Sequence, residues 1–281
     1  MKKLCALWAL LLCLALLAGC GQSADKPVEP LTATLLSVGK ADAIVLRCGD
    51  QTMVIDAGES DDGKALVNFL AWSEITRVDV LLITHFDRDH VGGAARLVKK
   101  LEVGRVLLPD YEGRNEEYEA FMAQLEKSGV APEYVTKTLR LTLGDAEVRV
   151  DPPESCPAAL TGDDADNDLS LITPVTHGSQ RLLFAGDAER ARLAEWLGQE
   201  TREPCGFLKM PHHGNYNKAL PELIKAVRPQ YAAICDSDKN PAEERTLALL
   251  EREGVETFET KNGEIAVTSD GKSLSVTQVG G

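Results

Sequence analysis

The sequence predicts an α/β protein in which two β-sheets pack face to face and helices cover their outer surfaces. Twice along the chain, a set of β-rich segments is followed by alternating strand-like and helix-like segments. Residues of the types that bind metals follow directly after several of the apolar strand-like runs. With 281 residues, of which 44% are hydrophobic and 26% charged, the chain can bury a sizeable core.

The first half opens with β-rich segments separated by turn residues, and Gly49-Asp50 predicts a hairpin turn. Leu66, Phe69 and Leu70 have the spacing of a helix face that packs on a core. The run that ends at Ile83 has the length and composition of a buried strand. The segments predicted as strands are 32–38, 43–48, 52–55, 78–83 and 103–108, and those predicted as helices are 64–72, 94–100 and 116–128.

The second half repeats this order and ends in a hairpin that turns through Asp270-Gly271-Lys272. No composition shift marks a boundary, so residues 31–281 are predicted to form one domain. The predicted strands are 136–143, 146–150, 169–175, 181–185, 207–210, 231–234, 264–269 and 273–279, and the predicted helices are 188–197, 220–227 and 242–253.

The loop after the strand 78–83 is the most informative segment of the chain. It reads Thr-His-Phe-Asp-Arg-Asp-His-Val-Gly-Gly and offers His85, Asp87, Asp89 and His90 within six residues. A strand that ends in such a loop can direct several side chains at one point, and imidazole with carboxylate suits Zn²⁺, Mn²⁺ or Fe. The alternative is a solvated polar loop, but two His and two Asp at this spacing favour a metal site.

Further ligands must come from other strand ends that meet this loop. Asp187 follows an apolar run and a glycine, and its alternative role is to cap the next helix. His212 and His213 follow the strand 207–210, and adjacent residues of a strand point to opposite sides. We therefore expect one ligand and one wall residue. Because related motifs present the ligand directly before a small-residue turn, His213 is the expected ligand and His212 the second choice. His177 falls in a predicted hairpin turn and is expected to be exposed and without function.

Together these motifs resemble the metallo-β-lactamase superfamily, whose first metal motif is His-x-His-x-Asp-His. Here the motif is His-x-Asp-x-Asp-His, which looks like the hydrolase domain of the ComEC-type competence proteins and its free-standing relatives. The resemblance runs from about residue 32 to 276 and implies a four-layer αββα sandwich. The segments that carry it are 37–43, 54–58, 84–93, 167–170, 184–187 and 208–214.

The resemblance also implies how the ligands divide. One metal position would hold Asp89, His90, Asp187 and His213, with Asp187 as a bridge to the other position. That second position would hold His85 and Asp87 together with Asp168 or Asn167, because the superfamily's histidine in the segment 167–170 is missing here. We therefore expect one or two divalent ions, Zn²⁺ or Mn²⁺, with the fuller set binding more tightly.

The implied chemistry is hydrolysis by a metal-bound hydroxide, with Asp87 or Asp89 orienting or deprotonating the water. A phosphodiester or nucleic-acid substrate fits the subgroup best, so a phosphodiesterase or nuclease is expected. Two departures from the family pattern favour the alternative of a metal-binding lipoprotein without turnover, serving in binding, DNA uptake or assembly. Asn215 stands where the family has Ser, and Asn240 stands in place of the His of a Gly-His-Pro motif. No feature identifies a protein partner.

The first nineteen residues predict a signal peptide: Lys2 and Lys3, then the apolar run 4–17. Leu-Ala-Gly before Cys20 resembles the lipobox of bacterial lipoproteins, which implies lipid on Cys20 and an extracytoplasmic position on the cell membrane. The alternative is a plain secretory signal with a chance cysteine. Residues 20–30 are predicted to be a tether between the membrane and the domain.

The chain is acidic, with a formal net charge of −14, and removal of Lys2 and Lys3 makes it two units more negative. Such a surface repels polyanions at long range, which counts against tight nonspecific binding of nucleic acid. Four cysteines would remain in the mature chain: Cys48, Cys156, Cys205 and Cys235. They are expected to be core residues first and disulfide partners second.

Overall fold

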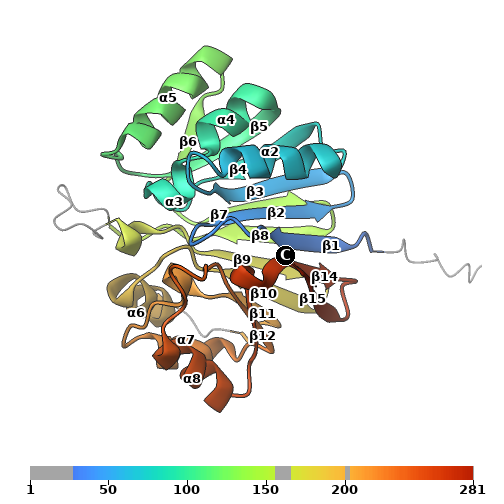
Figure 1. Ribbon diagram of the computed structural model, residues 1–281, viewed down its shortest axis with the longest axis vertical. Coiled ribbons are helices and arrows are strands. Elements are labelled where there is room, and N and C mark those ends of the chain that lie inside the picture. The colour runs from blue at the N-terminus through green and yellow to red at the C-terminus, as the bar shows by residue number, and fades with distance from the viewer. Residues whose placement is uncertain (1–27, 156–165, 200–202, 281) are drawn as a thin grey trace, which may run out of the picture.

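Two β-sheets lie face to face at the centre of the molecule, and helices cover the outer side of each (Figure 1). The computed structural model describes residues 28–155, 166–199 and 203–280. The predicted signal peptide, Cys20, most of the predicted tether and Cys156 lie outside the described residues. Within the described ranges, no helix is both long enough and apolar enough to cross a membrane.

The first sheet combines the first half of the chain with the C-terminal hairpin. Its strand order is β15-β14-β1-β2-β3-β4-β5-β6. Strands β3 to β6 run parallel to one another, whereas β14 pairs antiparallel with β1, and β15 pairs with β14 to form this edge of the sheet. The strands are β1 (Leu31–Leu35), β2 (Ala43–Cys48), β3 (Gln51–Ala57), β4 (Arg77–Leu82), β5 (Glu102–Pro109), β6 (Pro132–Val135), β14 (Gly263–Ser269) and β15 (Leu274–Gly280).

The second sheet has the order β13-β12-β11-β10-β9-β8-β7. Its strands β10 to β13 are parallel, and β7 to β9 are added as an antiparallel meander. The strands are β7 (Leu139–Leu143), β8 (Ala146–Val150), β9 (Thr173–His177), β10 (Gln180–Phe184), β11 (Phe207–Lys209), β12 (Tyr231–Ile234) and β13 (Glu256–Glu259).

The helices form the two outer layers. The first sheet carries α2 (Gly63–Trp72), α3 (Arg88–Val91), α4 (Ala94–Lys100) and α5 (Glu116–Ser128), and the second carries α6 (Arg190–Gln199), α7 (Leu220–Val227) and α8 (Glu244–Arg252) (Figure 1). Strand β4 shows why four layers form, because Val80 and Leu82 face the inter-sheet core while Val78 and Leu81 face the helices. A strand that is apolar on both faces needs a cover on both. The predicted αββα sandwich is confirmed.

The strand predictions failed where the chain is polar or irregular. Strands β6 and β13 were not predicted. Both are edge strands, one starting at a proline and the other reading Glu-Thr-Phe-Glu, so neither has the composition of a buried strand. The strand predicted over 169–175 begins only at Thr173, because residues 167–169 form a short 3₁₀ turn, η1 (Asn167–Leu169).

Cys48, Cys205 and Cys235 are buried and free, as expected of core residues. Burial raises the pKa of the Cys205 thiol to about 12, so this thiol stays protonated at neutral pH. The prediction that His177 is exposed was wrong. The residue does close the hairpin between β9 and β10, but its ring is fully buried and both ring nitrogens have hydrogen-bond partners.

Candidate metal centre

The predicted metal loop lies between β4 and α4, and α3 forms a single helical turn within it. Two glycines close it against the neighbouring turn after β3. A Cβ atom on Gly93 would lie 2.1 Å from the carbonyl oxygen of Ala57, and one on Gly92 would lie 2.6 Å from the backbone nitrogen of Ser60. Only glycine permits this close approach, which turns the loop back toward the carboxyl ends of the strands.

Four side chains from three segments meet at this point. One ligand atom from each of Asp89, His90, Asp187 and His213 lies within 4.8 Å of all the others. Oδ2 of Asp187 is 3.2 Å from Nε2 of His90 and 3.0 Å from Nε2 of His213. The Nε2 atom of His213 is also 3.2 Å from Oδ2 of Asp89. This is the fuller of the two predicted ligand sets.

The histidine rings are held so that one nitrogen of each faces the cluster. Nδ1 of His213 donates to the carbonyl oxygen of Cys235 at 2.9 Å, and Nδ1 of His90 lies 2.8 Å from Oδ2 of Asp56. This fixes the tautomer that leaves Nε2 free to bind a metal. The Nε2 atoms of His85, His90 and His213 are buried and make no hydrogen bond to any described residue.

These orphaned nitrogens test whether the residues fit a metal. Ligand atoms of a tetrahedral ion with bonds of about 2.0–2.1 Å are separated by roughly 3.3 Å. The nitrogen-to-oxygen distances of 3.0–3.2 Å in the cluster are close to this value. The Nε2 atoms of His90 and His213 are close to carboxylate oxygens without forming hydrogen bonds to them. This is expected of groups that are all directed at one cation. The residues present therefore fit a divalent ion.

The imidazoles and carboxylates of the cluster shift one another's pKa values when no metal ion is bound. Burial alone would lower the pKa of His213, but the carboxylates of Asp187 and Asp89 raise it to about 9. The pKa of His90 is raised in the same way, against its burial, by Asp187 and Asp56. Burial would raise the pKa values of Asp187 and Asp89, yet the facing imidazoles lower both. Protons bound by the two imidazoles thus supply the positive charge that a metal would otherwise provide.

Three buried charges behind the cluster were not predicted as site residues. Asp56 has a left-handed backbone with φ of 58°, and its carboxylate accepts from the backbone nitrogen and hydroxyl of Thr84, each at 2.7 Å. It thereby ties the metal loop to His90. Lys209 forms a buried ion pair with Asp42 and donates to the carbonyl oxygen of Gly186 at 3.1 Å. Asp42 and Asp56 also lie near His90, but these contacts assign them a supporting role.

A second, more open group adjoins the first. The rings of His85 and His90 are 4.0 Å apart between centroids, and Nε2 of His85 is 3.5 Å from Oδ2 of Asp87. Asp166 faces Asp87, and its pKa is raised by burial and by the charge of Asp87. Tyr111 donates to Oδ2 of Asp166 at 3.3 Å. Asp166 thus lies where Asp168 or Asn167 was expected.

The two residues that were expected there have other surroundings. Oδ1 of Asp168 accepts from the backbone nitrogen of Arg192 at 2.9 Å, at the start of α6. Asn167 is fully buried, and its Oδ1 makes no hydrogen bond to a described residue. The acidic run 163–166 in the sequence was the only signal for Asp166, and it does not distinguish one carboxylate from the next.

His212 points away from the cluster. Its Nδ1 lies 2.8 Å from a carboxylate oxygen of Glu189, and its Nε2 lies 3.1 Å from the amide nitrogen of Asn215. His212 and His213 both have left-handed backbones, with φ of 46° and 51°, within the short turn η2 (Pro211–Gly214). This turn, and not an extended strand, separates the two rings. That His213 binds the metal stays a prediction.

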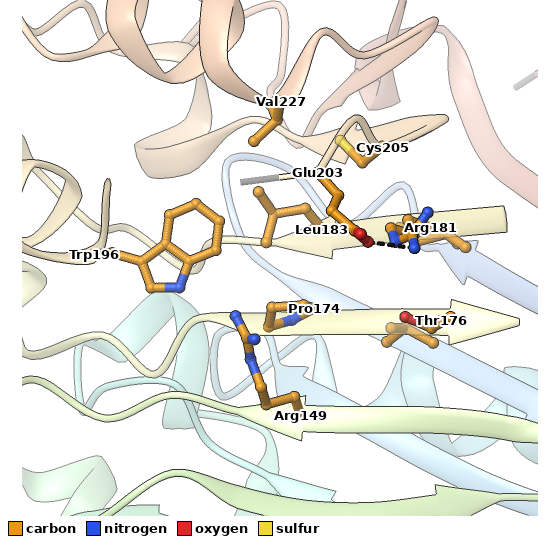
Figure 2. Close-up of a pocket in the computed structure, with 11 residues that line it drawn as sticks. Arg149, Pro174, Thr176, Arg181, Leu183, Trp196, Glu203, Cys205 and Val227 are labelled. Atoms are coloured by element: carbon orange, nitrogen blue, oxygen red, sulfur yellow. Dashed lines mark ion pairs between the residues drawn. The ribbon is translucent and has the colours of Figure 1, made fainter. Parts of the chain in front are cut away.

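A cavity also lies in a different part of the surface. A cavity of about 270 Å³ lies on the outer face of the second sheet beside α6, and Figure 2 shows its lining. Arg149, Pro174 and Trp196 form one side of it, and the ion pair of Arg181 with Glu203 lies opposite. None of the predicted ligands lines this cavity, so the chemistry of the chain has to be sought at the strand ends.

Comparisons with known proteins show which sequences and folds the chain is similar to. The family model described as Metallo-beta-lactamase superfamily matches residues 36–235. "ComE operon protein 3" of Bacillus subtilis (strain 168) is 28% identical over 206 residues, which cover 72% of this chain and 26% of that protein. "Recombination protein 2" of Haemophilus influenzae is 23% identical over 252 residues, covering 88% of this chain and 29% of that protein. The chain therefore spans less than a third of the length of these relatives.

Solved structures share the fold at low sequence identity. The metallo-beta-lactamase fold protein YhfI from Bacillus subtilis is 12% identical, with a TM-score of 0.55 over 86% of this chain and 100% of that one. A mutant of CmlA beta-hydroxylase is 16% identical, with a TM-score of 0.52 over 90% of this chain and 55% of that one. At these identities the likeness concerns the fold alone.

Proposed function

This chain belongs to the metallo-beta-lactamase superfamily, and from that premise we propose that it is a metal-dependent hydrolase that cleaves phosphodiesters, as a phosphodiesterase or nuclease. The observation that carries the proposal is the set of three buried Nε2 atoms on His85, His90 and His213, which face carboxylates but make no hydrogen bond to a described residue. Burying three such nitrogens without partners is costly unless a cation completes them.

The side chains divide by exposure into two roles. His90, Asp187 and His213 are almost fully buried and suit the holding of an ion. Asp87 and Asp89 have side chains that are 32% and 24% exposed, so they can reach both the ion and an incoming substrate. A bound divalent ion would lower the pKa of a water molecule and polarise the scissile group. Asp87 and Asp89 would orient that water and accept its proton.

The substrate class is proposed from the relatives and from the charge of the chain. The relatives include "Competence protein ComA" of Neisseria gonorrhoeae as well as the recombination protein, and the subgroup that the His-x-Asp-x-Asp-His loop resembles is the competence group. The acidic surface disfavours tight nonspecific binding of polyanions. We therefore propose that a phosphodiester is bound locally, at the metals, and not over an extended basic surface.

The test is turnover by the purified chain. Protein loaded with Mn²⁺ or Zn²⁺ should hydrolyse bis-p-nitrophenyl phosphate or single-stranded DNA, and Asp89→Ala should abolish this activity. Asp61→Ala is the matched control, because Asp61 is an exposed aspartate of the neighbouring turn outside the cluster. If the loaded protein turns over neither substrate, whereas lactones or β-lactams are hydrolysed, the phosphodiester assignment is wrong.

A specific observation also favours the alternative without turnover. The five histidines are His85, His90, His177, His212 and His213, and His177 is buried at a distant hairpin. Only His212 could then donate a proton to a leaving group, and it is paired with Glu189. In that case the chain is a metal-binding component in DNA uptake or assembly. Retained metal with no hydrolysis of any substrate would support this second function.

For location, we propose attachment to the extracytoplasmic face of the cell membrane through a lipid on Cys20. The support is the sequence pattern alone, because residues 1–27 lie outside the described part of the chain.

A further inference from the structure

The sandwich has two ends, one formed by hairpin turns and the other carrying the metal cluster. At one end lie the turns between β7 and β8, between β9 and β10, and between β14 and β15, and we call this the hairpin end. The metal cluster lies at the opposite end, because Asp187 follows the carboxyl end of β10 whereas His177 faces Gln180 at its beginning. In Figure 1, α3 of the metal loop and the start of β1 lie on opposite sides.

The chain enters the domain at the hairpin end and is held there. The backbone nitrogen of Glu29 donates to Asp145 at 2.9 Å, and the carbonyl oxygen of Glu29 lies 3.0 Å from Nε2 of His177. His177 is buried, and its Nδ1 lies 2.8 Å from the hydroxyl oxygen of Ser269. Direct contacts to two hairpins, with a third reached through His177, thus fix where residue 28 leaves the fold.

An exposed tryptophan lies at this same end. Trp72 ends α2 and is 83% exposed. The carbonyl oxygen of the next residue, Ser73, accepts from Arg47 at 3.5 Å, and Arg47 pairs with Thr32 at the start of β1. At the foot of α2 is an open hollow of about 380 Å³, and its apolar lining comes from Val67, Ala71, Ile75 and Leu101.

We propose that the hairpin end rests on a lipid bilayer, with the indole of Trp72 among the lipid headgroups and the metal cluster turned away from the membrane. Tryptophan prefers this interfacial layer because its ring is apolar and its N–H is polar. Lys99 and Lys100, at the end of α4, are exposed and carry the charge that anionic headgroups attract. The chain before residue 28 contains the apolar run 4–17 and Cys20 and leaves from this end.

The tether alone would not impose this orientation. The eight peptide units between Cys20 and Val28 can extend to roughly 27 Å, which allows the domain to roll over the surface. A second contact is needed to select one face, and Trp72 provides it. With β4 spanning roughly 20 Å, the cluster would lie at least that far above the lipid and would take a phosphodiester from solution. The inference rests on the proposed attachment and not on catalysis.

The experiment uses the mature lipidated chain, which begins at Cys20 and so lacks Trp8, bound to phosphatidylethanolamine–phosphatidylglycerol vesicles that contain brominated acyl chains. Two tryptophans then remain. Trp196 is buried and donates to Asp151 at 2.9 Å, so it should be unaffected by lipid. The emission of Trp72 should shift to shorter wavelength and be quenched by bromine, and Trp72→Phe should remove both effects while the protein still floats with the vesicles.

The matched control moves the indole to the other end. Tyr134 is 41% exposed and pairs with Leu108 near the carboxyl end of β5, on the side of the metal cluster. In the Trp72→Phe background, Tyr134→Trp should stay unquenched. Equal quenching at both positions, or an unquenched Trp72 on floating protein, overturns the orientation and leaves the attachment standing. The Cys20→Ser variant should fail to float. If protein with Cys20 intact also fails to float, attachment and orientation are both refuted. A spectral shift that depends on protein concentration without vesicles would mean that Trp72 meets a second copy instead.

Discussion

Single residues decide which groups of the metal centre can bind an ion. His212 and His213 are neighbours in sequence, yet only the Nε2 atom of His213 is buried among carboxylates. The ring of His212 is half-buried and paired with Glu189. The same substitution at each of these adjacent positions therefore tests which histidine binds the ion.

We predict that His213→Ala lowers the affinity for the tightly held metal by at least about 100-fold, because even groups that only orient a ligand contribute 10–100-fold. His212→Ala should leave this affinity within about twofold. Competition titration with a chromogenic chelator measures both. A loss of metal from the His212 variant and not from the His213 variant would reverse the assignment.

The two ligand groups should also differ in affinity. Asp89, His90, Asp187 and His213 form a complete set, whereas His85 and Asp87 have only Asp166 and a shared Asp187 to complete theirs. Purified protein should retain close to one equivalent and take up a second only from added metal. His90→Ala should remove the retained metal, whereas His85→Ala and Asp166→Asn should abolish only the second uptake. Calorimetric titration showing two equal sites would contradict this ordering.

At the scale of elements, the short turn η1 is held in place by helix α6. The side chain of Arg192 is fully buried and donates to the carbonyl oxygens of Ser170 at 3.0 Å and of Asp151 at 2.7 Å. The hydroxyl of Ser170 in turn accepts from the backbone nitrogen of Asp187 at 3.2 Å. The helix thus positions both Asp187 and the turn that follows Asp166.

Arg192→Met should therefore destabilise the protein and loosen the second metal position. Two buried carbonyl groups lose their charged donor, at about 1–3 kcal/mol each, so the free energy of unfolding should fall by about 2–6 kcal/mol. Arg190→Met, on the exposed side of the same helix, is the control and should change stability by less than about 0.5 kcal/mol. Urea unfolding followed by circular dichroism measures both. Equal effects of the two substitutions would show that Arg192 has no special role.

For the molecule as a whole, the paired charges of the centre make stability depend on pH when metal is removed. The pKa of His213 rises from 6.5 to about 9 on folding, so its protonated form favours the folded state. This contribution is complete below pH 6.5 and is lost as the pH rises through about 9. The pKa of His90 moves in the same direction.

Metal-free protein should accordingly become less stable between pH 6.5 and 9, by up to about 1.4 kcal/mol per pH unit for each proton released. Metal-loaded protein should show the opposite slope, because the ion binds only neutral imidazole and its affinity rises with pH. Thermal melts of both forms across this range measure the difference. Parallel slopes would mean that the ion does not displace these protons.

What the sequence could predict was local. The loop 84–93 carries candidate ligands and glycines of its own, and apolar runs before Asp187 and His213 identify strand ends. The cluster of side chains could therefore be located from the sequence, and its binding of an ion stays a prediction. The sequence could not assign supporting roles to Asp56, Asp42 and Lys209. The pattern of an aspartate near a strand end is the same whether its carboxylate binds an ion or supports a histidine, and the partner of a buried lysine depends on the tertiary structure. His177 was predicted to be exposed because a hairpin turn usually is, but residues distant in the sequence, Glu29 and Ser269, contact its buried ring.

The division of the ligands between the two sheets bears on how the protein is made. His85 to His90 leave the ribosome early, but Asp187 and His213 belong to the other sheet and appear only after most of the chain has been synthesised. The last hairpin, β14 and β15, must then return to β1 before the first sheet is complete. Firm retention of an ion is therefore a sign that both halves have folded and met, and a truncated or half-folded chain should be distinguishable by its failure to keep one.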